Sequence, residues 1–131
     1  MSGTAAHGAD RPSRAALVAT AGEIIAAGSR SFAAASRLLD RTSREQAWLL
    51  YAWCRTCDDL IDGQALGHDA GTIVDAPARL AAIRARTDAV LAGDWVGDPG
   101  FDGLRFVIAE TEMPRALLDD LIAGFALDAD D

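Results

Sequence analysis

The stretch from residue 43 to residue 62 restricts the possible folds most, because it has the pattern of a long helix that is apolar over most of its surface. Thr42 and Glu45 have the spacing of a capping box, with a hydroxyl at the N-cap and a carboxylate three residues later. Gly63 stands where a glycine commonly ends a helix. The apolar side chains on the wheel are Leu49, Leu50, Trp53, Cys57, Leu60 and Ile61. We therefore predict a largely buried helix of roughly 30 Å.

The remainder of the chain also has helical character. Alanine, leucine and arginine are frequent and favour helix, and no segment alternates as a half-buried strand does. Helical segments are predicted over residues 13–27, 31–39, 43–62 and 75–91, and from residues 98 and 114 onward, with residues 63–74 as a loop. The local signals are Ser13, Asp75 and Asp98 as N-caps, Gly28 and Gly93 as breaks, and Pro99 and Pro114 at helix starts. The expected fold is all-α, an antiparallel helical bundle.

Charge and hydropathy limit the classes of partner. We expect residues 1–12 to form a flexible N-terminus and residues 13–131 to belong to a single domain. Residues 1–12 lack the basic and apolar regions of a secretory signal, and the sequence contains no run of apolar residues long enough to span a membrane, so a cytoplasmic location is expected. The formal net charge of −8 argues against binding to nucleic acid, which requires a basic surface. A protein this acidic that bound phosphates would need a divalent cation between its carboxylates and the ligand.

One narrow charged stripe interrupts the apolar surface of the helix over residues 43–62. Tyr51, Arg55, Asp58 and Asp62 fall within roughly 60° of one another on the wheel, and Asp59 lies beside them. The carboxylates of Asp58 and Asp62 are one turn apart and repel unless a cation lies between them. Mg²⁺ suits such a pair, because it accepts carboxylates, water and substrate phosphates. A solvated surface, with Arg55 in a weak ion pair to Asp58 or Asp59, is the competing interpretation.

Cys54 and Cys57 have the spacing of a redox pair, but they lie deep inside the predicted helix rather than at its start. A single pair of cysteines is also a poor zinc site. We interpret both as core thiols.

The run from Tyr51 to Asp62, YAWCRTCDDLID, resembles the first aspartate-rich motif of the squalene/phytoene synthase family. The segment from Gly28 to Phe32 resembles the Ser-Arg/Lys-Ser-Phe element that precedes this motif, and Gly124 to Asp128 is similar to a further segment of bacterial phytoene synthases. The resemblance covers roughly residues 14–131. It implies an all-α isoprenoid synthase fold and a transferase that uses Mg²⁺ to condense two prenyl diphosphates head to head, with two geranylgeranyl diphosphates giving phytoene.

The resemblance also implies roles for individual residues. The magnesium ligands are Asp58 and Asp62, with Asp59 as the acid between them; the substrate contacts near the diphosphate, and the catalytic candidates, are Tyr51 and Arg55; the upstream diphosphate contacts are Ser29, Arg30 and Ser31. Phe32 is expected to pack against the cavity, and Trp48 and Trp53 to lie in the cavity wall or the core. Apart from the resemblance, the segment from Ser29 to Ser31 reads as a helix break with local capping.

Members of the family carry a second aspartate-rich motif, which this sequence lacks. Asp119 and Asp120 begin a similar tetrapeptide, but Ala123 and Gly124 stand where the paired carboxylate would be. We therefore expect the chain to be the N-terminal part of an isoprenoid synthase domain, incomplete as an enzyme, which a complementary C-terminal half could complete. Exposed apolar helix faces are expected to follow.

Several alternatives remain open. A squalene or hydroxysqualene synthase would use farnesyl diphosphate instead. A helical module that binds diphosphate or partner helices without catalysis, and a plain helical scaffold, are alternatives from other classes. Because prenyl diphosphates are lipids, peripheral contact with a membrane is also compatible with the resemblance, although no basic amphipathic anchor is evident.

Overall fold

The computed structural model describes residues 11–62 and 76–130, with the backbone alone at residues 76 and 126–130. The described part is all-α, as predicted, with no strand in either range. Its helices are α2 (Arg14–Gly28), α3 (Arg30–Ser36), α4 (Arg41–Asp62), α5 (Ala76–Leu91), α6 (Pro99–Asp102), α7 (Leu104–Thr111) and α8 (Arg115–Asp130). None of them is long and apolar enough to cross a membrane.

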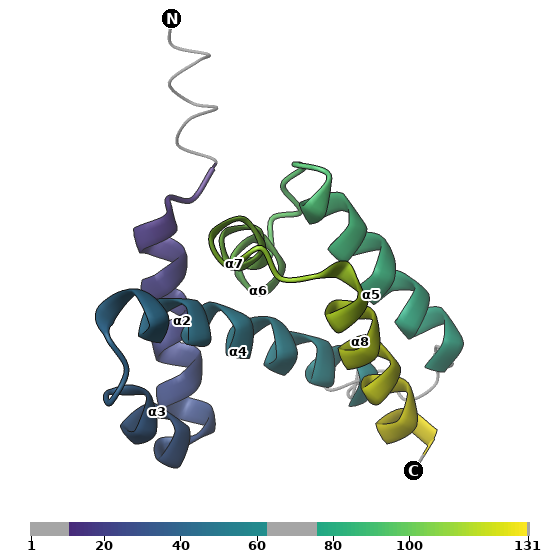
Figure 1. Ribbon diagram of the computed structural model, residues 1–131. Coiled ribbons are helices and arrows are strands. Elements are labelled where there is room, and N and C mark those ends of the chain that lie inside the picture. The colour runs from purple at the N-terminus through teal and green to yellow at the C-terminus, as the bar shows by residue number, and fades with distance from the viewer. Residues whose placement is uncertain (1–10, 63–75, 131) are drawn as a thin grey trace, which may run out of the picture.

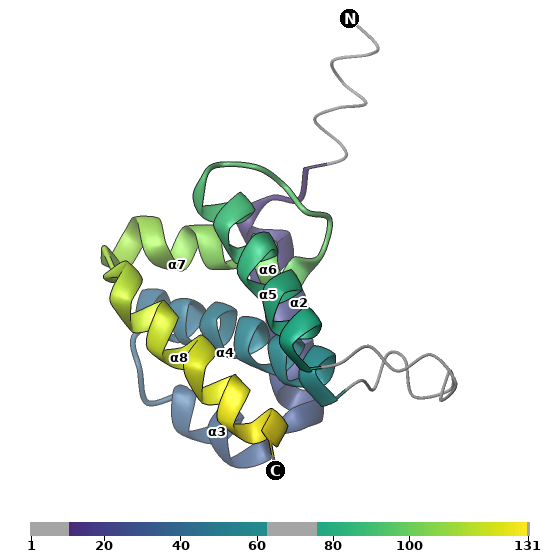
Figure 2. The same cartoon turned by 90° about the vertical axis from the view of Figure 1, so that its right-hand side faces the viewer.

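Helix α4 lies at the centre and packs against α2, α5, α6, α7 and α8. Helix α2 crosses it steeply near its start, whereas α5 and α8 lie side by side and run antiparallel near its end (Figures 1 and 2). The buried face of α4 consists of Leu49, Ala52, Trp53, Cys57 and Ile61. This is the apolar face that the sequence predicts, so burial of one helix by its neighbours organises the fold.

Local signals set several of the helix ends. The Ser13 hydroxyl accepts from the Ala16 N–H at 3.1 Å, and the Asp98 carboxylate accepts from the Gly100 N–H at 3.0 Å, so both predicted N-caps are confirmed. Gly93, after α5, has a φ of 104°, which favours glycine. The predicted segment from residue 98 consists of two helices, α6 and α7, which meet at Gly103. The predicted signals at Gly63 and Asp75, the loop at 63–74 and most of the predicted N-terminal arm lie outside the described residues.

One predicted helix start and one predicted helix end are wrong. Helix α4 begins at Arg41, so Thr42 lies inside its first turn instead of at the N-cap. The Glu45 carboxylate, which a capping box would direct to a backbone amide, accepts from Arg14 at 2.6 Å and from Arg41 at 3.2 Å. Charged donors form the stronger hydrogen bonds and keep it away from the helix start. Helix α3 ends at Ser36 rather than at residue 39. At this end, the Ser36 hydroxyl donates to the Ala33 carbonyl at 2.8 Å.

The cysteines are free thiols in an apolar setting. Cys57 is fully buried and Cys54 is partly buried, which supports the core interpretation. Burial, with a contribution from the Asp58 charge, raises the pKa of Cys54 to about 11, and burial also raises the pKa of Cys57. Both therefore remain protonated and unreactive at neutral pH.

Arg14 joins three helices that are distant in sequence. Its Nη1 lies 2.6 Å from Glu45 Oε1 on α4, and its Nε lies 2.6 Å from Glu110 Oε2 on α7. These hydrogen bonds hold the pKa of both carboxyl groups below their usual range. We name Arg14, Glu45 and Glu110 the α2 clamp.

Replacing Arg14 by methionine is expected to lower the free energy of unfolding by about 1 kcal/mol at neutral pH, since the clamp is partly exposed to solvent. A carboxyl whose folded pKa is lowered stabilises the fold above its ordinary pKa of about 4.3. That stabilisation is lost as the pH falls through the lowered value. The wild type and Arg14→Met should therefore converge in acid, in urea titrations over a pH series. Arg115→Met, which removes more exposed ion pairs to Asp88 and Asp119, is the control and should cost less at neutral pH. A difference that is constant with pH would contradict this account.

Candidate functional site

The site begins at the corner between α2 and α3, where Ser29 closes one helix and opens the next. Its backbone is extended (φ −158°, ψ 99°), and its N–H donates to the Ile25 carbonyl at 2.8 Å. Its hydroxyl accepts from the Phe32 N–H at 3.1 Å. The interpretation of this segment as a helix break with local capping is therefore confirmed for Ser29. Arg30 and Ser31 follow in the first turn of α3 and are exposed, so they are available to a ligand.

Tyr51 of α4 lies directly against this corner. Its ring stacks on Phe32, with 5.2 Å between centroids and 22° between planes. A Cβ at position 28 would lie only 2.7 Å from the Tyr51 hydroxyl oxygen, so the phenol fits because residue 28 is a glycine. The two sequence elements singled out above, the segment around Ser29 and the stripe on α4, are thus in contact.

Beside Tyr51, a shallow groove of about 240 Å³ separates α2 from α4. Its walls are Ile24, Ala27 and Gly28 on α2, and Arg55, Thr56 and Asp59 on α4. A larger hollow of about 380 Å³ lies nearer the start of α4, around Arg44 and Trp48. None of the predicted catalytic, substrate-binding or metal residues lines it. The smaller groove is therefore the one that matters for the predicted site.

Within the groove, Arg55 pairs with Asp59. The Nε of Arg55 lies 3.7 Å from Asp59 Oδ1, and both side chains are partly exposed, so the pair is weak. Asp59 Oδ1 is nevertheless enclosed and accepts no hydrogen bond from the described part of the chain. Asp59 is one of the two partners that the sequence allowed for Arg55, and the pair with Asp59 is present. The guanidinium thus lies at the groove with most of its hydrogen-bonding capacity unused by this pair.

Asp58 and Asp62 lie one turn apart along the last part of α4. Asp58 is half-buried and Asp62, the last residue of the helix, is exposed. Asp58 lies close enough to Cys54 and Cys57 for its charge to contribute to their raised pKa values. Asp59 points toward α2 instead, as its place in the groove wall indicates. Asp59 is thus a partner of Arg55, and Asp58 and Asp62 remain the candidate metal ligands.

The Asp58–Asp62 pair fits a hard divalent cation only in part. All its donors are carboxylate oxygens, which is the ligand type that Mg²⁺ prefers. Across residues 11–62 and 76–130 there is no group of three or more His, Cys, Asp or Glu side chains that could hold a metal. Mg²⁺ commonly takes one or two carboxylates and completes its shell with water and phosphate oxygens. The pair fits that mode of binding, in which the substrate supplies ligands.

Asp119 and Asp120 on α8 do not form a comparable site. Asp119 accepts from Arg115 on the same helix at 3.2 Å, and Asp120 is exposed. Neither aspartate has a carboxylate four residues later on α8, since those positions are Ala123 and Gly124.

Sequence reasoning missed several residues of the site. Ile24, Ala27 and Thr56 complete the groove, and Arg79 of α5 reaches the end of α4. The spacing of Ile24, Ala27 and Gly28 places them on one face of α2, which was an available signal. No signal in the sequence points to Arg79.

Replacing Gly28 by alanine is expected to displace the Tyr51 ring from Phe32, because the added Cβ would lie 2.7 Å from the hydroxyl. Tyr51 is the only tyrosine in the chain, so its ring protons can be followed by NMR without assignment ambiguity. The loss of stacking should move these resonances toward random-coil shifts at little cost in stability, since the hydroxyl is the far end of a rotatable side chain. Gly124→Ala, where a Cβ meets nothing within 4 Å, is the control and should leave them in place. Unchanged tyrosine resonances in Gly28→Ala would refute the contact.

Known proteins with similar sequences were compared with the chain. Residues 25–131 match the family model described as squalene/phytoene synthase. The chain is 46% identical over 114 residues to a 15-cis-phytoene synthase of Paracoccus sp. (strain N81106 / MBIC 01143). The matched region covers 87% of this chain and 38% of that protein. It is 38% identical over 108 residues to a 15-cis-phytoene synthase of Pantoea ananas (81% and 35%), and 40% identical over 115 residues to a phytoene synthase of Pseudescherichia vulneris (86% and 37%). The chain thus spans little more than a third of the length of these curated relatives. No solved structure matches it.

Proposed function

The chain belongs to the squalene/phytoene synthase family, and from this premise we propose that it forms the diphosphate-binding part of a phytoene synthase-like prenyltransferase. The substrate class would be prenyl diphosphates, with geranylgeranyl diphosphate preferred and phytoene as the product, in line with the names of the most similar relatives. The observation that carries the proposal is the contact between the corner at Ser29 and the Tyr51–Asp62 stripe around one groove.

Each residue has a role that follows from its chemistry. Asp58 and Asp62 would hold Mg²⁺, which supplies the positive charge that makes diphosphate a better leaving group. Arg55, at the mouth of the groove, would bind phosphate oxygens through the donors that its weak pair with Asp59 leaves free. Arg30 and Ser31 would contact the diphosphate from α3, since both are exposed beside the corner.

Ser29 has a different part in this scheme. Its hydroxyl already accepts from the Phe32 N–H, so its first duty is to fix the corner that presents Arg30 and Ser31. Tyr51 would line the substrate channel with its ring and place its hydroxyl near the diphosphate, held by Phe32 on one side and Gly28 on the other. The apolar wall beside it would shield the ionised prenyl chain from water. A cytoplasmic location, with peripheral contact at a membrane that holds the product, is part of the same proposal.

A chimera tests the proposal with the remaining two-thirds of a relative in place. The 114-residue matched region of the Paracoccus enzyme would be exchanged for the corresponding region of this chain. The chimera would then be incubated with Mg²⁺ and labelled geranylgeranyl or farnesyl diphosphate. Phytoene from the first substrate supports the proposal, and a squalene-type product from farnesyl diphosphate supports the alternative family activity. A folded chimera that converts neither would indicate a non-catalytic module.

A further inference from the structure

The last turn of α4 carries unfavourable negative charge that no basic residue within the turn compensates. A helix C-terminus carries partial negative charge on carbonyls that have no partner within the helix. Asp58 and Asp62 add two carboxylates at this end, and the last turn of α4 contains no basic residue. Like charges and unbonded carbonyls both favour fraying of the turn. Both effects oppose the helical turn that must keep the two carboxylates on one face.

A side chain from another helix reaches this end of α4. The Nη1 of Arg79, near the start of α5, donates to the carbonyl oxygen of Ile61 at 2.9 Å. Ile61, between Asp58 and Asp62 in sequence, is itself buried at 6% exposure, so the bond lies at the edge of the core. The Nε of Arg79 is enclosed as well and has no hydrogen-bond partner among the described residues. A cation held in this way satisfies one terminal carbonyl and places positive charge where the helix dipole favours it.

We propose that Arg79 is a positioning residue for the Asp58–Asp62 pair. By binding the Ile61 carbonyl, Arg79 keeps the last turn of α4 helical, and the helical turn keeps the two carboxylates at the one-turn separation that a divalent cation can bridge. This inference rests on the proposed function where it assumes that Asp58 and Asp62 bind a cation. The stabilisation of the last turn of α4 by Arg79 does not depend on that assumption. Arg79 itself would touch neither the substrate nor the metal.

The sign of one measurement separates positioning from simple charge repulsion. A nearby guanidinium repels a metal ion, so removal of its charge alone would tighten cation binding. Removal of a group that orders the ligands would weaken cation binding, by about tenfold for supporting residues of this kind. The two effects have opposite directions, and the dissociation constant of Mn²⁺, measured by electron paramagnetic resonance, reports which one dominates.

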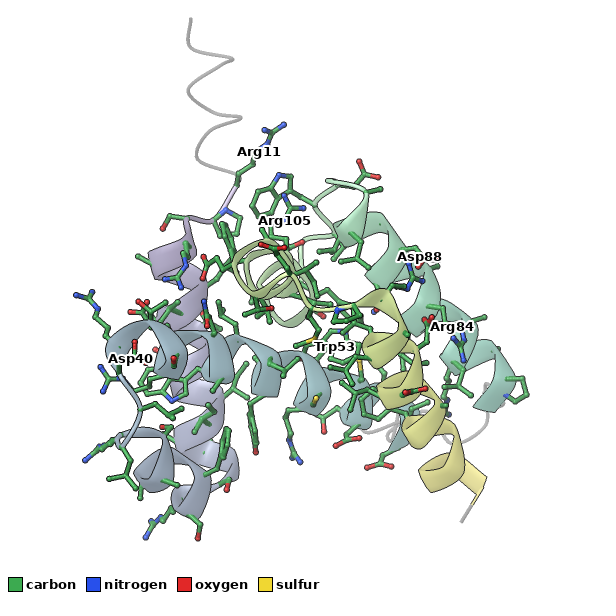
Figure 3. The ribbon with its side chains drawn as sticks, in the orientation of Figure 1. Arg11, Asp40, Trp53, Arg84, Asp88 and Arg105 are labelled. Carbon is green, nitrogen blue, oxygen red and sulfur yellow. The ribbon has the colours of Figure 1, made fainter. Side chains whose placement is uncertain are left out.

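The test compares Arg79→Met with Arg84→Met, an exposed arginine on the same helix that is labelled in Figure 3, and with Arg79→Lys. Hydrogen exchange at the amides of residues 58–62 is expected to accelerate about fivefold to tenfold in Arg79→Met. Residues 47–52, near the middle of α4, should keep their protection and so show that the helix as a whole remains folded. Arg84→Met should match the wild type, and Arg79→Lys should retain most of the protection because an ammonium can also donate to the carbonyl.

Accelerated exchange confined to the last turn, together with weaker Mn²⁺ binding, is the result expected. Unchanged exchange in Arg79→Met would overturn the proposal, and so would faster exchange combined with tighter Mn²⁺ binding. If the wild type binds no Mn²⁺ but its last turn still depends on Arg79, the helix-end part of the proposal stands and the proposed metal site fails.

Discussion

Replacing Asp58 and Asp62 together by asparagine is expected to abolish Mn²⁺ binding by the chain and to reduce phytoene formation by the chimera at least about 10³-fold. Asparagine has nearly the size of aspartate but no charge, so it cannot neutralise a divalent cation that in turn screens diphosphate. Both side chains lie on one helix, one turn apart, and Asp62 is exposed, so the substitution leaves the packing of the buried face intact.

Stability should change much less than activity. Asp62 is exposed at the C-terminal end of α4, where negative charge is unfavourable, so neutralising it should not lower the urea concentration at which the chain unfolds. A large loss of activity without loss of stability is the signature of residues kept for function. The matched control is Asp119→Asn with Asp120→Asn on α8, because residues 119–122 have the same Asp-Asp-Leu-Ile sequence as residues 58–61. This control should change neither Mn²⁺ binding nor turnover substantially. Full turnover in the Asp58 and Asp62 variant would rule out this pair as the site.

Replacing Trp53 by alanine is expected to lower the free energy of unfolding by about 3–5 kcal/mol. Trp53 has 0% exposure and lies where α4, α5 and α8 meet (Figure 3). Its ring meets Phe125 edge-on, with 5.7 Å between centroids, and its Nε1 donates to the Thr87 hydroxyl at 3.4 Å. Alanine would leave a large cavity and deprive a fully buried hydroxyl of its donor.

The loss is comparable to the whole stability of a small domain, which is about 5–15 kcal/mol. We therefore expect Trp53→Ala to retain helical far-ultraviolet dichroism but to lose its near-ultraviolet signal and to bind a hydrophobic dye, as a loosely packed state does. Trp48→Ala is the comparison, because Trp48 is only partly buried and borders a hollow, and it should cost less. Equal urea midpoints for the wild type and Trp53→Ala would contradict the central place given to this residue.

Signals confined to a few neighbouring residues were the reliable part of the sequence. Ser13 and Asp98 cap helices as predicted, because an N-cap depends only on a side chain and the amides two or three residues ahead. The capping box at Thr42 failed for the opposite reason. Glu45 is bound by Arg14 and Arg41, and the bond to Arg14 joins residues that only the folded chain brings together. A local pattern cannot foresee a competing partner from another helix.

The candidate site divides in the same way. The stripe from Tyr51 to Asp62 follows from periodicity alone, since one helix fixes the relative directions of its side chains. The approach of Gly28 to Tyr51 and the bond from Arg79 to Ile61 depend on how helices pack, and periodicity carries no such information. Only the resemblance to a family linked the segment around Ser29 to the stripe before their contact was known.

The α2 clamp has a consequence for the order of folding. The bonds that Ser29 makes at the corner close within four residues, whereas Arg14 and Glu110 are 96 residues apart. Contacts between distant residues form late when the intervening chain must first be ordered. We therefore expect the corner to be structured in the folding transition state and the clamp to be absent from it. Arg14→Met should then leave the refolding rate nearly unchanged and accelerate unfolding, so the clamp determines how long the folded chain persists rather than how quickly it forms.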